Sequence, residues 1–156
     1  MYKIVRARPD GSCFFHSVGF LTDMKASDLR MIVSKLILKH KHSNFNDLTL
    51  SNWILYETGL TAEQYSHQIL FHKWGGALEM KLLSDFFNRS IVVYSRSGSR
   101  SGSRGSQADR ILVVHPSERE ECPSKGPILL LYSGNSHYDA ILEPSSNQVH
   151  SQKGRE

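Results

Sequence analysis

Cys13 is the residue of this chain whose surroundings best fit nucleophilic chemistry. It follows residues 9–11, Pro-Asp-Gly, in which proline fixes one dihedral and glycine permits a positive φ, as a tight turn requires. Ser12 then stands at the expected N-cap of a helix whose apolar residues recur at helical spacing. At such a position, unpaired backbone N–H groups and the positive end of the helix dipole stabilise a thiolate or a developing oxyanion. The alternative, for a cysteine beside two phenylalanines, is a small buried hydrophobe.

A thiol nucleophile requires a general base, and His137 is the best placed of the eight histidines. It lies in a polar segment between two predicted strands, where a side chain projects from a rigid edge. Asp139 follows two positions later, and alternate residues of a strand share one face of the sheet. The spacing therefore predicts a carboxylate–imidazole hydrogen bond, as in a catalytic triad. The other seven histidines are interpreted as helix, turn or tail residues.

The two cysteines, Cys13 and Cys122, are too few for a disulfide framework and too far apart for a clustered zinc site. Unpaired cysteines persist in a reducing compartment. We therefore expect a reactive or inert thiol, no metal site and a cytoplasmic location.

The composition is that of an ordinary globular protein. A chain of 156 residues with 39% apolar and 22% charged residues can form one domain with its own core, which excludes collagen-like, coiled-coil and wholly disordered classes. The longest apolar run, residues 128–132, is far shorter than the ~20 residues of a membrane span, and the N-terminus lacks the apolar region of a signal peptide. The net charge is +4, and residues 95–106 contribute three arginines to it, so the rest of the chain is nearly neutral.

The elements that must position these residues follow from hydrophobic periodicity and turn chemistry. Helices are predicted at residues 13–21, 27–40, 50–57, 62–69 and 77–87, with Gly59 ending the third and a Thr61–Gln64 capping box opening the fourth. Strands are predicted at residues 2–7, 91–94, 111–114, 128–132 and 138–142. Helices followed by strands indicate an α+β domain over residues 1–143, with helices packed around a small, mostly antiparallel sheet. Residues 95–106, rich in Ser, Arg and Gly, are expected to form a mobile hairpin loop, and residues 144–156 a polar flexible tail.

Three segments carry a resemblance to a known family. Residues 10–18, Asp-Gly-Ser-Cys-Phe-Phe-His-Ser-Val, resemble the nucleophile motif of the ovarian-tumour (OTU) cysteine proteases. Residues 74–79, Trp-Gly-Gly-Ala-Leu-Glu, resemble the segment that opens the central helix in that family. Residues 128–139 resemble its strand and histidine-containing turn. Three motifs in order, within residues 2–143, are far more specific than any one of them.

The resemblance implies a papain-type cysteine protease fold and deubiquitinase activity, which is hydrolysis of the isopeptide or peptide bond after the C-terminal glycine of ubiquitin. It implies Cys13 as nucleophile, His137 as general base and then acid, and Asp139 as the residue that orients the histidine. Asp10 matches an acidic residue often counted as catalytic and is expected to shape the Cys13 turn. The implied oxyanion hole consists of backbone N–H groups of Gly11, Ser12 and Cys13. The resemblance implies no cofactor.

A channel for the diglycine tail of ubiquitin is expected to include Trp74, Gly75, Asn135 and Ser136. For Trp74 and the glycines after it, the alternative is purely structural, because two glycines before a helix often permit a tight entry and a tryptophan there usually packs. The chain departs from the family pattern in two ways. It contains the Ser/Arg/Gly segment, and its 156 residues show no match to the additional ubiquitin-like or zinc-finger region that members of this branch often carry.

The leading prediction is a monomeric deubiquitinase that acts on ubiquitin and polyubiquitin conjugates, and two other functions are considered beside it. One is a catalytically inactive ubiquitin-binding module, against which the complete set of site residues argues. The other is an RNA-binding domain that uses the three arginines of residues 95–106, a segment without an aromatic residue to stack on a base. The sequence leaves open which ubiquitin linkage is cleaved, whether a ubiquitin-like modifier is also a substrate, and whether the source is cellular or viral. For a viral source, the expected location is the host cytoplasm.

Overall fold

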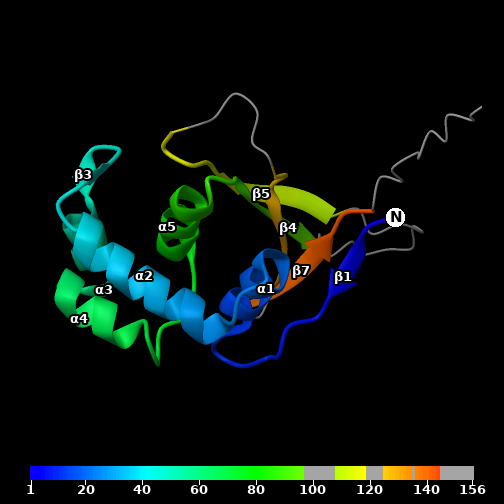
Figure 1. Ribbon diagram of the computed structural model, residues 1–156, viewed down its shortest axis with the longest axis horizontal. Helices are drawn as coiled ribbons and strands as arrows, with labels where there is room; N and C mark the ends of the chain where they lie inside the picture. The colour runs from blue at the N-terminus through cyan, green and yellow to red at the C-terminus, as the bar shows by residue number, and fades with distance from the viewer. Residues whose placement is uncertain (97–107, 119–124, 135, 145–156) are drawn as a thin grey trace, which may run out of the picture.

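The structure is a computed structural model that describes residues 1–96, 108–118, 125–134 and 136–144. Figure 1 shows a twisted sheet at one end of the molecule, helices α2, α3 and α4 gathered at the other end, and α1 and α5 between them. This arrangement confirms the predicted α+β class.

The main sheet joins strands from both ends of the chain. Its order is β1 (Lys3–Val5), β7 (His137–Leu142), β6 (Ile128–Ser133), β4 (Ile91–Arg96) and β5 (Ala108–Val114). The β4–β6 pair is parallel and the other pairs are antiparallel, so the sheet is mostly antiparallel as expected. The N-terminal strand pairs with β7, and this pairing brings the chain just before the Cys13 turn alongside the strand that carries His137 and Asp139.

The helices are α1 (Cys13–Thr22), α2 (Ala26–His40), α3 (Leu50–Thr58), α4 (Ala62–Gln68) and α5 (Ala77–Phe87). The capping box of Thr61 and Gln64 is present, and Gly59 ends α3 with a left-handed φ of 71°. Sequence periodicity did not predict the two-residue strands β2 (Asn44–Phe45) and β3 (Leu48–Thr49), which form a small hairpin between α2 and α3.

The main core lies where α1 and α5 pack against the sheet, and the same apolar cluster continues among α2, α3 and α4. It includes the fully buried side chains of Phe14, Phe15, Leu83, Ile91 and Leu130. Each such side chain contributes about 1.5–3 kcal/mol relative to an exposed one, so this layer supplies much of the stability that holds the site in place. Cys13, which is 5% exposed, directly precedes two phenylalanines of this core.

Several element boundaries differ from the sequence-based expectation. Ser95 and Arg96 belong to β4, where they pair with Asp109 and Ala108, rather than to a loop. His137 begins β7, one residue earlier than predicted, because it pairs with Ser133 of β6. Residues 97–106 of the expected hairpin loop, residues 145–156 of the expected tail and Cys122 lie outside the described residues.

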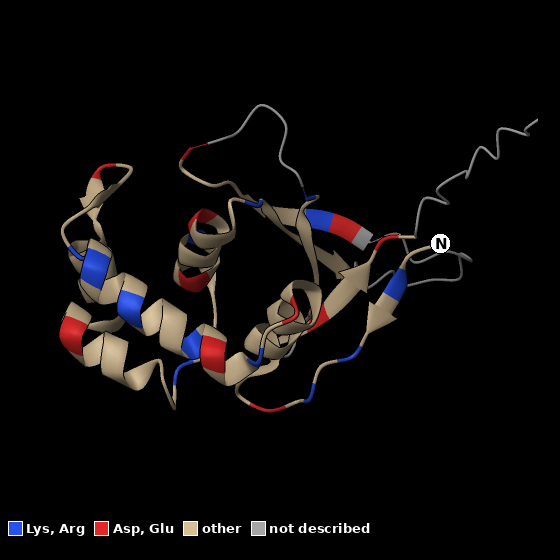
Figure 2. Ribbon diagram, in the orientation of Figure 1, with Lys and Arg blue, Asp and Glu red and all other residues tan. Residues whose placement is uncertain are grey.

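Figure 2 shows basic and acidic residues interspersed along the ribbon; an acidic residue lies next to a basic one on β5, whereas most charged residues of α2 are basic. Among the described residues, no helix is long and apolar enough to cross a bilayer.

Candidate functional site

Cys13 is the first residue of α1; it is a free cysteine, and the residue is 5% exposed. The turn before it is closed by two hydrogen bonds: the backbone nitrogen of Cys13 donates to the carbonyl oxygen of Asp10 at 3.2 Å, and that of Ser12 donates to Oδ1 of Asp10 at 2.8 Å. The sequence prediction of a turn followed at once by a helix is confirmed. The hydroxyl of Ser12, however, does not cap the helix, because it accepts hydrogen bonds from another side chain, Arg30.

His137 and Asp139 lie on β7 and face the same side of the sheet. Nε2 of His137 is 2.9 Å from Oδ1 of Asp139, so the predicted hydrogen bond is present. The same Oδ1 accepts the backbone N–H of Ala7 at 2.8 Å. A carboxylate only accepts, so the proton between the pair belongs to Nε2 and the other ring nitrogen of His137 is free to accept a proton. Asp139 is buried and His137 is about one-quarter exposed, so only the imidazole reaches solvent.

Helix α1 and strand β7 are joined at three places, and these contacts bring the thiol to the histidine turn. The Cys13 Sγ lies 3.8 Å from the carbonyl oxygen of Ser136, the neighbour of His137. One turn along the helix, the hydroxyl of Ser17 donates to the carbonyl of Tyr138 at 3.0 Å. The rings of Phe14 and Tyr138 meet edge to face with centroids 5.6 Å apart. The thiol and the His137–Asp139 pair therefore share one site.

Asp10 shapes the Cys13 turn, as expected from its sequence position. Besides binding the Ser12 N–H, its Oδ2 lies 3.2 Å from Nε2 of His16. Slight burial raises the pKa of the Asp10 carboxyl, but the Ser12 and His16 hydrogen bonds and the nearby charges of His16 and Arg8 outweigh it, and the net pKa lies below its usual value. His16 was interpreted from the sequence as an ordinary helix residue, so its pairing with Asp10 is new.

The predicted oxyanion donors are brought to the thiol, but two of them already have acceptors. The N–H groups of Ser12 and Cys13 bind Oδ1 and the carbonyl oxygen of Asp10, respectively. In this conformation, these two groups stabilise the turn itself. A substrate oxyanion that used them would have to replace contacts to Asp10.

Trp74 lies beside the Cys13 turn and remains 58% exposed, which does not fit the purely structural interpretation of a packed tryptophan. A methyl group on Gly11 would lie 3.0 Å from the indole Nε1 of Trp74, so the absence of a side chain at Gly11 makes room for the ring. A methyl group on Gly75 would overlap Cδ1 of Phe14, so Gly75 permits close packing of the segment on α1. Of the other expected channel residues, Ser136 is exposed beside the thiol, and Asn135 lies outside the described residues.

The start of α5 beneath this segment is anchored by a buried carboxyl group. Glu79 is 2% exposed; it accepts the hydroxyl of Tyr65 at one oxygen and the backbone N–H of Gly76 at the other, 2.8 Å away. Burial raises the pKa of Glu79, and the two hydrogen bonds only partly oppose this effect. The capping contact to Gly76 fixes the entry into α5 just after Trp74 and Gly75.

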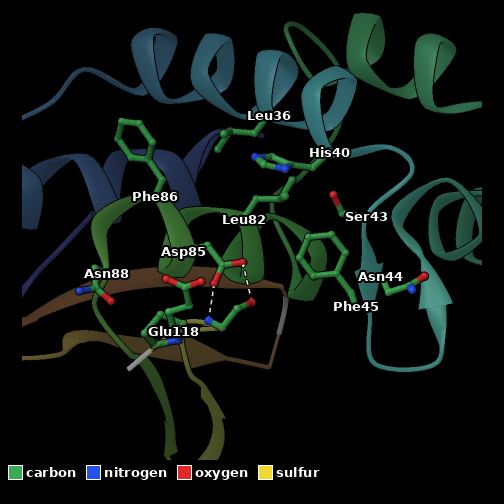
Figure 3. Close-up of a pocket in the computed structure, with 12 residues that line it drawn as sticks. Leu36, His40, Ser43, Asn44, Phe45, Leu82, Asp85, Phe86, Asn88 and Glu118 are labelled. Atoms are coloured by element: carbon green, nitrogen blue, oxygen red, sulfur yellow. Dashed lines mark hydrogen bonds between the residues drawn. The ribbon is translucent and has the colours of Figure 1, made fainter. Parts of the chain in front are cut away.

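A cavity of about 800 Å³ lies away from this site. Figure 3 shows α2 contributing Leu36 and His40, and α5 contributing Leu82, Asp85 and Phe86. Phe86 is 48% exposed and lines this open cavity. None of the predicted site residues borders it.

Arg30 is the residue that sequence reasoning missed. It is 6% exposed and donates hydrogen bonds to Ser12, Gly11, Ile69 and Lys73. A signal was available, because Arg30, Val33 and Ile37 follow helical spacing and the latter two are buried. A charged residue on a buried stripe requires polar partners.

Comparisons with known proteins agree with this geometry. A family model described as OTU-like cysteine protease matches residues 8–139. The chain is 30% identical over 136 residues to an OVARIAN TUMOR DOMAIN-containing deubiquitinating enzyme 2 of Arabidopsis thaliana; the match covers 85% of this chain and 54% of the plant protein, so the chain spans about half the length of that relative.

Solved structures share the fold. The Hazara virus OTU bound to ubiquitin superimposes with a TM-score of 0.66 and 21% identity, over 93% of this chain and 83% of the viral one. An OTU deubiquitinase from Wolbachia pipientis wMel bound to ubiquitin gives a TM-score of 0.61 and 17% identity, over 91% and 96% of the two chains. Because the family model extends from just before the Cys13 turn to Asp139, the protein belongs to the OTU-like cysteine protease family.

Proposed function

We propose that this chain is a deubiquitinase that cleaves the bond after the C-terminal glycine of ubiquitin through a Cys13 thioester. The observation that carries the proposal is the single site formed by the Cys13 thiol, the adjacent Ser136 carbonyl and the His137–Asp139 pair. Family membership and the ubiquitin-bound OTU structures of the same fold support ubiquitin as the substrate.

In the proposed reaction, His137 accepts the thiol proton and Sγ of Cys13 attacks the carbonyl carbon of the terminal glycine. The tetrahedral intermediate collapses as His137 gives its proton to the leaving amine, and a thioester remains. Water then attacks with His137 as base, which releases the ubiquitin carboxylate and restores the thiol. Asp139 fixes the proton on Nε2 and stabilises the imidazolium between these steps.

The oxyanion of each intermediate is proposed to bind backbone N–H groups of Gly11, Ser12 and Cys13. Since Asp10 holds two of these groups, the proposal requires its contacts to loosen when substrate binds. Trp74 and Gly75 are proposed to wall the channel for the diglycine tail, with Ser136 on the opposite side of the thiol. We also propose a cytoplasmic location, because a catalytic thiol must stay reduced.

The decisive experiment is reaction with ubiquitin that carries a thiol-reactive group at its C-terminus, followed by mass analysis. We expect one adduct, at Cys13, and loss of both the adduct and turnover in Cys13→Ala. Cys122→Ser is the matched control and should react like the parent. Labelling at Cys122, or cleavage by Cys13→Ala, would refute the mechanism, and ubiquitin binding without labelling would favour an inactive binding module.

A further inference from the structure

Arg30 is a buried cation that has no anionic partner in contact. No carboxylate of the described residues lies within ion-pair distance of its guanidinium. Burial lowers the pKa of Arg30, and the more distant charges of Asp10 and Glu79 oppose that effect. A charge in such a place is costly unless each of its N–H groups has an acceptor.

Each N–H group of the guanidinium does have an acceptor. Nε and Nη2 donate to Oγ of Ser12 at 3.1 and 2.8 Å, and Nη2 also donates to the carbonyl of Gly11 at 3.0 Å. Nη1 donates to the carbonyls of Ile69 and Lys73, both at 2.7 Å. These bonds match the five donors that a guanidinium possesses. The group also lies over the ring of Phe15, 4.4 Å from its centroid.

The acceptors belong to two segments far apart in the sequence. Gly11 and Ser12 form the turn that leads into Cys13, and Ile69 and Lys73 belong to the segment that leads into Trp74. Because a peptide unit is planar, fixing the carbonyl of Gly11 also fixes the direction of the Ser12 N–H. One side chain on α2 therefore contacts both the turn that leads into Cys13 and the segment that leads into Trp74.

We propose that Arg30 is a positioning residue of the thiol site, which holds the Cys13 turn and the Trp74 segment at a fixed separation. The proposal deepens the proposed function, on which its turnover test rests. Lysine cannot replace arginine here, since one ammonium offers three donors from a single point and cannot bind both segments in the same way.

The test compares Arg30→Lys, Ser12→Ala and the double variant with Arg89→Lys. Arg89 is the control arginine because it is partly buried, its Nε donates to the carbonyl of Gly126 at 2.7 Å, and it lies outside the site. Turnover of a fluorogenic ubiquitin substrate is expressed per active site titrated with the ubiquitin probe. Melting curves and the rate of Cys13 alkylation by iodoacetamide are measured alongside.

We expect Arg30→Lys to lower kcat per titrated site by about 10- to 100-fold, in the range found when a transition-state donor is misplaced. Ser12→Ala should lower it by about 3- to 10-fold, and the double variant should lose less than the product of the two, since both changes disrupt the hydrogen bonds between Arg30 and Ser12. Arg89→Lys should keep the parental kcat. A purely structural role predicts instead a lower melting temperature and fewer titrated sites with an unchanged kcat per site, which would overturn the proposal.

Two further outcomes remain informative. If Arg30→Lys does not fold, Ser12→Ala decides, because it leaves the other acceptors in place; parental kcat in that variant would overturn the proposal. If the parent does not cleave ubiquitin, the proposed function fails, but alkylation still reports on the thiol turn. A change in the alkylation rate of about 3-fold or more in Arg30→Lys would then support positioning, and a rate equal to that of the parent would refute it.

Discussion

Oδ1 of Asp139 lies 2.8 Å from the backbone nitrogen of Ala7, a residue 132 positions earlier in the chain. The same oxygen accepts from Nε2 of His137. One carboxylate oxygen therefore links His137 to the segment just after β1. The orientation of His137 thus depends on how β1 pairs with β7.

Replacing Asp139 by alanine removes the acceptor of two donors at once. We expect Asp139→Ala to lower turnover of a ubiquitin substrate by about 100-fold or more, since His137 loses its orienting partner. The free energy of unfolding in urea should fall by about 1–3 kcal/mol, because the Ala7 N–H is left unpaired. Asp139→Asn keeps one oxygen acceptor and should recover part of both losses. Near-parental turnover in Asp139→Ala would remove Asp139 from the mechanism and direct attention to Asp10.

Trp74 tests the proposed substrate channel. Because its ring is more than half exposed, Trp74→Ala should change the melting temperature little while lowering kcat/KM for a ubiquitin substrate by about 10-fold, as for an aromatic contact residue. The rate of Cys13 alkylation by iodoacetamide should stay parental. Tyr56→Ala is the control, because Tyr56 is an exposed aromatic residue on α3. Equal losses in both variants would argue against a specific channel at Trp74.

The lowered pKa of Asp10 predicts an acid-sensitive contribution to stability. At pH values above the ordinary pKa of 3.8, this carboxyl is ionised in both the folded and the unfolded state, so its contribution to stability is fully present. It is lost as the pH falls from that value through the lower pKa of the folded state. The difference in unfolding free energy between the parent and Asp10→Asn, measured in urea from pH 6 to pH 2.5, should therefore be constant above about pH 4.5 and shrink below it. A difference that grows on acidification would contradict the assignment.

Glu79 predicts the opposite pH dependence. Its pKa is raised in the folded state above the ordinary value of 4.5, so the folded protein retains a proton that the unfolded chain has released. The parent should lose stability as the pH rises from 4.5 through the folded pKa, whereas Glu79→Gln should not. Urea unfolding between pH 4 and pH 8 measures this divergence, and Glu143→Gln provides an exposed control. Parallel curves for the parent and Glu79→Gln would show that the buried carboxyl does not titrate in this range.

Much of the site was predictable because its parts are local. The two-residue period of a strand was enough to predict that His137 and Asp139 share a face, and turn chemistry was enough to place Cys13 at the start of a helix. The same local signals gave the capping box at Thr61 and the end of α3 at Gly59.

The sequence by itself determined the five helices, the strands of the main sheet and the types of group that meet at the thiol, because backbone geometry repeats over a few residues and leaves its period in the chain. Only the tertiary structure decided which distant atoms those groups contact. Ser12 resembles an N-cap in the sequence, yet its hydroxyl accepts from Arg30, and the carboxylate of Asp139 accepts from Ala7 at the far end of the chain. Such pairings depend on how whole segments pack, and a buried donor bonds to whichever acceptor that packing brings within reach.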